Sequence, residues 1–88
     1  MIDMATLIKA DGTKIEDYNY HGLKAKQNAV GGYIEYVYTQ KYVIVVNEEG
    51  ILWNQPMNIE VSALAGQMIV GDCLVMTRQE QLNEEYLD

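Results

Sequence analysis

The amino-acid sequence predicts an α+β fold, with a mainly antiparallel sheet of four to six strands and one to three short helices, including a C-terminal helix. Residues 33–39 and 42–47 are rich in tyrosine and β-branched residues and are separated only by Gln40 and Lys41, which is typical of a β-hairpin. Asp11-Gly12, a strong two-residue turn signal, predicts a second hairpin. The adjacent Gly31-Gly32 predict a helix end and then a strand start, because glycine adopts positive φ without a Cβ penalty.

The elements of the N-terminal half follow from these turns. Residues 4–10 are predicted to form a strand that pairs with residues 13–17 across Asp11-Gly12. Over residues 23–30 the apolar side chains can share one face, so the pattern predicts a short helix of about two turns. A helix this short persists only when it packs against the rest of the protein.

The C-terminal half contains weaker signals. Residues 51–53 are apolar and form a candidate strand, which ends before Pro56 because proline cannot donate to a β-ladder. Residues 59–65 predict one or two helical turns. Residues 68–76 predict the last core strand, with a bulge or bend at Gly71-Asp72.

The end of the chain is acidic. Thr77 followed three residues later by Glu80 matches a capping box, so residues 78–88 are predicted to form an acidic C-terminal helix or tail. A chain of 88 residues is long enough for one domain, which we assign to residues 1–88. A domain of this size buries little surface, so an oligomer or a ligand would add stability.

Cysteine content and hydropathy predict a cytoplasmic protein. The single cysteine, Cys73, excludes an internal disulfide framework and suits a reducing compartment. No apolar run is longer than residues 43–46, so no segment is expected to span a bilayer. The N-terminus lacks the basic start and long apolar core of a signal peptide.

The net charge of −7 is concentrated after residue 29, where nine acids face only Lys41 and Arg78. Clustered Lys and Arg, which bind a phosphate backbone, are missing, so direct nucleic-acid binding is disfavoured. Two explanations for the acidity stay open. One is solubility, and the other is a basic protein partner, including mimicry of nucleic acid toward it.

No residue pattern indicates catalysis, a cofactor or a metal ion. His21 is the only histidine, and with Asp17 it supplies too few ligands for a typical metal site. Cys73 lies in an apolar strand and is interpreted as a core residue. Ser62 has no nearby histidine or nucleophile elbow. Gly31-Gly32 follow a helix rather than a strand, which is the wrong order for a dinucleotide loop. We therefore expect no enzymatic activity.

Tyrosines are concentrated in the central hairpin. Strand alternation places Tyr36 and Tyr38 on one face and Tyr33 and Val37 on the other, so both faces carry bulky side chains. Tyrosine is enriched at interfaces, although cross-strand packing explains the same pattern. We expect the hairpin to help form a self-association or partner surface. The candidate partner-binding residues are aromatic or acidic: Tyr36, Tyr38, Glu48, Glu49, Trp53, Glu60, Glu80, Glu84 and Glu85.

Four motifs together carry a resemblance. They are the hexad of residues 30–35 (Val-Gly-Gly-Tyr-Ile-Glu), the turn of residues 46–50 (Val-Asn-Glu-Glu-Gly), Asn58 after the proline loop, and Ile-Val-Gly at residues 69–71. Over residues 5–77 the chain resembles the small family catalogued as domain of unknown function 3846. The resemblance implies an α+β fold and occurrence in phages, plasmids and conjugative elements. The family has no assigned activity, so it implies no catalytic residues.

Three functional classes are compatible with these observations. The first is a counter-defence protein that binds and inhibits a nucleic-acid-handling host protein in the cytoplasm of the bacterial host. The second is an oligomeric binder or sponge for a small molecule such as a nucleotide signal, although the chain has few positive groups for phosphates. The third is a non-inhibitory accessory or assembly component. No cofactor, nucleic acid or membrane is an expected partner, whereas a homodimer or higher homo-oligomer is an open alternative.

Overall fold

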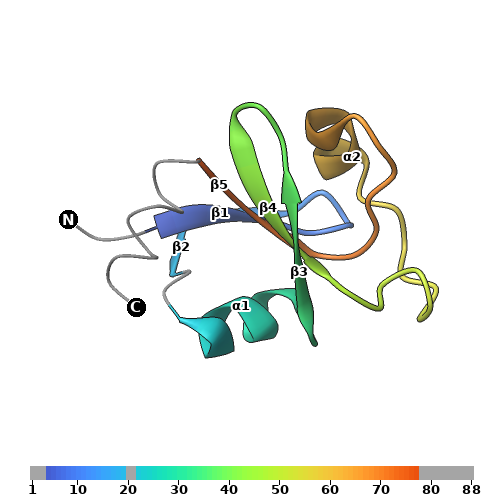
Figure 1. The fold of residues 1–88 in the computed structure, drawn as a ribbon, viewed down its shortest axis with the longest axis horizontal. Coiled ribbons are helices and arrows are strands. Elements are labelled where there is room, and N and C mark those ends of the chain that lie inside the picture. The colour runs from blue at the N-terminus through green and yellow to red at the C-terminus, as the bar shows by residue number, and fades with distance from the viewer. Residues whose placement is uncertain (1–3, 20–21, 78–88) are drawn as a thin grey trace.

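Two hairpins and a late strand form a five-stranded antiparallel sheet within residues 4–19 and 22–77, the part of the chain that the computed structural model describes (Figure 1). The strand order in the sheet is β2-β1-β5-β4-β3. In chain order the elements are β1 (Met4–Ile8), β2 (Lys14–Asn19), α1 (Leu23–Val30), β3 (Ile34–Tyr38), β4 (Tyr42–Asn47), α2 (Ile59–Ala65) and β5 (Cys73–Thr77). The last of these strands, β5, lies at the centre of the sheet between β1 and β4.

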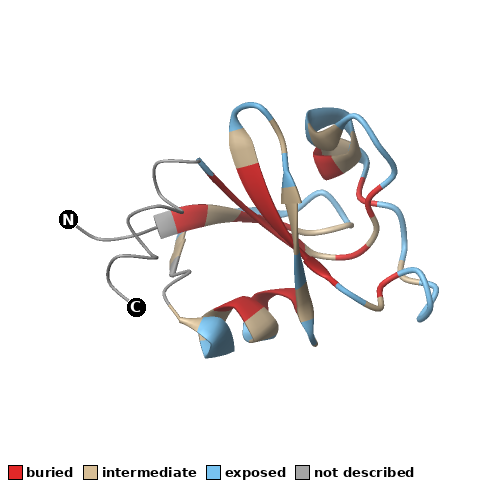
Figure 2. Ribbon diagram, in the orientation of Figure 1, coloured by how far each residue is buried: buried red, intermediate tan, exposed pale blue. Residues whose placement is uncertain are grey.

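The uninterrupted apolar run of β4 reflects cover on both faces of the sheet. Successive side chains of a strand point to opposite faces. Val43 and Val45 belong to a core that includes the end of α1, whereas Ile44 and Val46 belong to a core that includes Val61 of α2. The two helices therefore cover opposite faces, and Figure 2 shows the buried residues along β4 and β5 between them.

The two edges of the sheet differ. At the tip of the β1–β2 hairpin Gly12 has φ +96°, which confirms a turn at this position. The Lys9 N–H donates to Thr13 O over 2.8 Å and Ile8 pairs with Lys14, so the loop has three residues rather than the predicted two, and β1 ends at Ile8 rather than at residue 10. Further along β2 the register shifts, and Asp17 has φ +55°. This β-bulge disturbs one edge of the sheet. The other edge, β3, pairs with β4 in regular register from Ile34 to Tyr38.

The double glycine ends α1 as predicted, but its two residues serve different purposes. Gly31 is left-handed with φ +80°, and the N–H groups of Gly31 and Gly32 both donate to Gln27 O, over 2.8 and 3.1 Å. Gly32 is needed for space, because a Cβ there would lie 3.0 Å from Asn47 Nδ2. Gly31 thus ends the helix, and Gly32 lets Asn47 at the end of β4 lie close to the backbone.

The predicted fold class is corrected at its C-terminal end. Within the described residues the class is α+β, with five antiparallel strands and two helices, and the predicted C-terminal helix is not part of this fold. Thr77, the predicted N-cap, is the last residue of β5 and pairs with Tyr42. A capping box is a local signal that carries no information about sheet pairing. Residues 78–88, on which the helix was predicted, lie outside the described residues.

The predicted strand at residues 51–53 is also wrong. Local hydrogen bonds turn this segment, because the N–H of Trp53 donates to Glu49 O and the N–H of Asn54 donates to Ile51 O. The predicted bend in the last strand is confirmed. Gly71 has φ +80°, and β5 begins only at Cys73.

Candidate functional site

An open groove of about 710 Å³ lies where the end of α1, the start of β3 and the loop of residues 48–57 meet. It is lined by Gly31, Gly32 and Asn47 and by the aromatic residues Tyr33 and Trp53. Its other lining residues are Gln27, Asn28, Glu49 and Gln55. We call it the α1–loop groove.

Asn47 is the fixed point of the groove. It is buried at the end of β4, and its Nδ2 donates to Val30 O over 3.1 Å. Its Oδ1 accepts a hydrogen bond from the Glu49 N–H over 2.8 Å. The Asn47 amide therefore connects the end of α1 to the loop, and both of its ends already have a hydrogen-bond partner within the protein.

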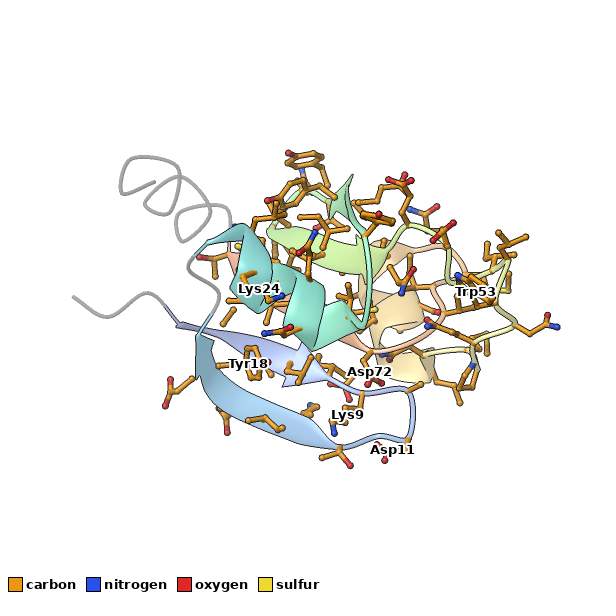
Figure 3. All side chains as sticks on the ribbon, turned by 90° about the horizontal axis from the view of Figure 1, so that it is seen from below. Lys9, Asp11, Tyr18, Lys24, Trp53 and Asp72 are labelled. Carbon is orange, nitrogen blue, oxygen red and sulfur yellow. The ribbon has the colours of Figure 1, made fainter. Side chains whose placement is uncertain are left out.

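The loop that carries Trp53 is hydrogen-bonded along its length. The N–H of Glu48 donates to Tyr33 O, that of Gly50 to Asn47 O, and that of Gln55 to Gly50 O, over 2.9 to 3.1 Å. The Trp53 side chain is nevertheless 66% exposed, as is that of Tyr33. In Figure 3, Trp53 lies on this loop far from Lys24 and Lys9. The loop thus presents a large aromatic side chain to solvent from an ordered backbone.

A second feature, which we call the 51–68 apolar surface, adjoins the groove. It consists of exposed large apolar side chains from the loop, from α2 and from the turn after α2: Ile51, Leu52, Trp53, Met57, Ile59, Leu64 and Met68. Ile51 and Met68 line one hollow of about 190 Å³ together with Val37. Figure 2 shows exposed residues on both the loop and α2. Clusters of exposed apolar side chains, such as Ile51 with Met68, mark interaction sites in many proteins.

The predicted partner-binding residues separate into different regions. Glu49 and Trp53 line the α1–loop groove, whereas Glu48 lines the neighbouring hollow. Tyr36 and Tyr38 lie on the edge strand β3 with ring centroids 6.1 Å apart. Tyr36 is partly buried against the core under α1, and Tyr38 is exposed at the far end of β3 from the groove.

The remaining predicted residues do not join this region. Glu60 lies on α2 and forms an ion pair with Lys14 of β2. The hydrogen bond and charge of Glu60 raise the pKa of Lys14. Glu80, Glu84 and Glu85 lie outside the described residues.

Sequence reasoning missed several residues of the site. Ile51 and Leu52 are exposed loop residues, although their apolar character suggested a strand. The available signal was length, since the apolar run between Gly50 and Asn54 has only three residues, the lower limit for a strand. Gln55 and Met68 gave no signal, because only the fold brings them to the groove and to the hollow.

Cys73 is a buried core residue, as predicted. Its Sγ donates to Gly71 O over 3.4 Å, and burial, assisted by the Asp72 charge, raises the pKa of the thiol to about 12. The ordinary value is near 9, so folding favours the protonated thiol. This contribution to stability is complete below about pH 9 and is lost as the pH rises toward the folded-state pKa.

We therefore expect the Cys73 thiol to resist a thiol reagent at about pH 8 and to react once the protein is unfolded.

The free energy of unfolding should fall more steeply with pH above about pH 9 in the parent protein than in Cys73→Ala, because only the parent carries this linkage. Denaturant titrations at several pH values measure both slopes. Equal slopes would contradict the expected linkage.

The described residues contain no cluster of three His, Cys, Asp or Glu side chains that could hold a metal ion. Within residues 4–19 and 22–77, neither helix has the length and apolar character needed to cross a membrane.

The fold and the site define a small α+β domain with an exposed groove and apolar surface beside the loop after β4. The chain belongs to the family described as Domain of unknown function (DUF3846), whose model matches residues 4–87. The match runs past Thr77, the end of the recognised resemblance, into the acidic C-terminal segment. Neither the curated proteins nor the solved structures gave a match.

Proposed function

We propose that this chain is a non-enzymatic protein of a phage or other mobile element that binds a host protein in the cytoplasm and inhibits it. The observation that carries this proposal is the 51–68 apolar surface. It includes the exposed side chains of Ile51, Leu52 and Trp53 on a hydrogen-bonded loop, and Ile51 shares a hollow with Met68 from the turn after α2.

The energetics of this surface favour a protein partner. Tryptophan and other large side chains in the centre of an interface supply most of its binding free energy. The hydrogen bonds from Glu48, Gly50 and Gln55 hold the loop before any partner arrives. A preorganised loop loses less conformational entropy on binding, which leaves more of the contact energy as affinity.

The charge around the surface indicates what kind of protein would bind. Glu48 and Glu49 adjoin the exposed apolar residues of the loop, and residues 42–77 contain neither Lys nor Arg. Glu60 of α2 contributes less, because it forms an ion pair with Lys14 of β2. Electrostatic complementarity then favours a partner with Lys and Arg around an apolar centre. Nucleic-acid-handling proteins carry such basic surfaces, so they are the proposed class of target.

A small-molecule binder is the second candidate, and the α1–loop groove is the observation in its favour. Its volume of about 710 Å³ falls in the range of ligand pockets. Among the described residues, however, its lining has no Lys or Arg side chain to neutralise a phosphate. A nucleotide is therefore a poorer occupant than a cation, and the protein-binding function is preferred.

Leu52→Ser tests the proposed function. Leu52 is 74% exposed and lies outside the core, so the variant should fold normally. Affinity purification with the parent chain from a bacterial host lysate, followed by mass spectrometry, identifies the target. We expect Leu52→Ser to bind that purified target about tenfold more weakly, since burial of a leucine side chain contributes roughly 1.5 kcal/mol or more. Calorimetry or surface plasmon resonance measures the affinity.

The matched control is Leu23→Ser. Leu23 is 58% exposed at the start of α1, away from the 51–68 apolar surface, so this variant should bind as the parent does. The target's own activity should fall when the parent chain is added, and it should fall less when Leu52→Ser is added at the same concentration. Equal affinity of the two serine variants, or an unaffected target activity, would contradict the proposal.

A further inference from the structure

The α1–loop groove has the chemistry of a cation site. We infer that it receives an arginine side chain of the partner protein, with the guanidinium group between Trp53 and Tyr33 and close to Glu49. This inference rests on the proposed function for its partner. It is supported by three separate features of the groove: its charge, its aromatic lining residues and its hydrogen-bonding groups.

The charge of the groove has one sign. Glu49 supplies a carboxylate, and within residues 4–19 and 22–77 no Lys, Arg or His side chain lines the groove. The groove also meets the C-terminal end of α1, where the helix dipole places partial negative charge. The last turn of α1 contains no basic residue to offset that charge. A cation is therefore favoured there, and an anion is disfavoured.

The aromatic lining residues favour a planar cation. Trp53 and Tyr33 both line the groove, and both side chains are largely exposed on hydrogen-bonded backbone. The face of an aromatic ring attracts a cation, and tryptophan does so most strongly. A guanidinium group is planar and weakly hydrated, so it stacks on such a face more readily than a lysine ammonium does.

The hydrogen-bonding groups of the groove can use several donors. Besides the Glu49 carboxylate, the side-chain amides of Gln27 and Asn28 line it. Asn47 also lines the groove, but its amide already bonds to Val30 O and to the Glu49 N–H. A guanidinium group carries five N–H donors in a fixed plane, which can reach several of the other acceptors. Arginine can therefore satisfy more of these acceptors at once than any other side chain.

Trp53 is the only tryptophan of the chain, so its fluorescence reports directly on the groove. The probe is the peptide acetyl-Gly-Arg-Gly-amide, and its comparator is the same peptide with citrulline, which is nearly isosteric but uncharged. We expect a saturable change in Trp53 emission with the arginine peptide and at least tenfold weaker binding of the citrulline peptide. The lysine peptide should bind with intermediate affinity. Equal binding of arginine and citrulline, or tighter binding of lysine, would overturn the inference.

Two neighbouring carboxylates give a matched pair of variants. Glu49→Gln should weaken binding of the arginine peptide severalfold, because Glu49 lines the groove. Glu48→Gln should bind as the parent does, because Glu48 lines the neighbouring hollow instead. Raised salt should weaken the parent and leave Glu49→Gln less affected. Equal losses in the two variants would assign the effect to overall charge and overturn the inference.

The partner protein separates this inference from the proposed function. If Leu52→Ser loses the target but Glu49→Gln retains full affinity, the protein-binding function holds and the arginine site is overturned. If the arginine peptide binds with the expected variant pattern but no host protein is inhibited, the site holds and the proposed function fails.

Discussion

Replacing Asn58 with alanine is expected to destabilise the protein by about 3–5 kcal/mol, because each buried polar group left without its partner costs roughly 1–3 kcal/mol. Asn58 is almost fully buried at the N-cap of α2. Its Nδ2 donates to Ile8 O over 2.8 Å and to Gly71 O over 2.9 Å, and its Oδ1 accepts from the Val61 N–H over 3.1 Å. Urea unfolding followed by circular dichroism measures the loss.

Aspartate at the same position distinguishes the contribution of Nδ2 to stability from that of Oδ1. Asn58→Asp keeps an acceptor for the Val61 N–H but places a carboxylate against the carbonyl oxygens of Ile8 and Gly71. We expect it to be no more stable than Asn58→Ala, even though aspartate is an equally good N-cap residue. Asn28→Ala, on an exposed position of α1, is the control and should change stability by less than about 0.5 kcal/mol. A stable Asn58→Asp variant would contradict the assigned roles of Nδ2.

Replacing Gly71 with alanine is expected to cost about 2 kcal/mol, since a non-glycine residue with positive φ costs roughly 1–2 kcal/mol and displacement of the flexible Gln55 side chain adds a smaller steric part. Gly71 has φ +80°, and a Cβ there would overlap Gln55 Oε1 and lie 3.0 Å from Gln55 Cδ. The variant must therefore displace the Gln55 side chain and strain the backbone where β5 begins. The free energy of unfolding, measured in urea, gives the cost.

A double-mutant cycle divides this cost into its two parts. Gln55→Ala removes the side chain that the new Cβ would overlap, and it also removes a buried oxygen that has no hydrogen-bond partner among the described residues. Gln55→Ala alone should be nearly neutral. Combined with Gly71→Ala it should recover the steric part and leave the cost of positive φ. Strict additivity of the two changes would show that Gln55 and Gly71 do not interact.

The turns and the central strands were predictable because their signals are local. Asp11-Gly12 and Gly31-Gly32 define chain reversals within a few residues, and the alternation along β3 correctly placed Ile34 and Tyr36 on one face and Val37 on the other. The N-cap role of Thr77 was predicted wrongly, because this residue satisfies a local capping pattern while its backbone pairs with Tyr42. Pairing between distant strands leaves no comparable local pattern.

The candidate site was predicted only in part. Glu49 and Trp53 were identified from residue type, since acids and tryptophan are typical of partner surfaces. Their convergence with Tyr33 depends on Asn47, whose amide joins the end of α1 to the loop. Periodicity describes one element at a time, so it does not show which residues from different elements share a groove.

The central position of β5 has a consequence for how the protein is made. Residues Thr6 and Val75 are neighbours in the sheet although 69 positions separate them in the chain, and β4 also lacks one neighbour until β5 is present. During translation the two hairpins emerge first and cannot join until Cys73–Thr77 leaves the ribosome. Such distant pairing slows folding relative to helical domains of the same size. A nascent chain stopped before Cys73 should remain sensitive to protease, and protection should appear only after β5 has emerged.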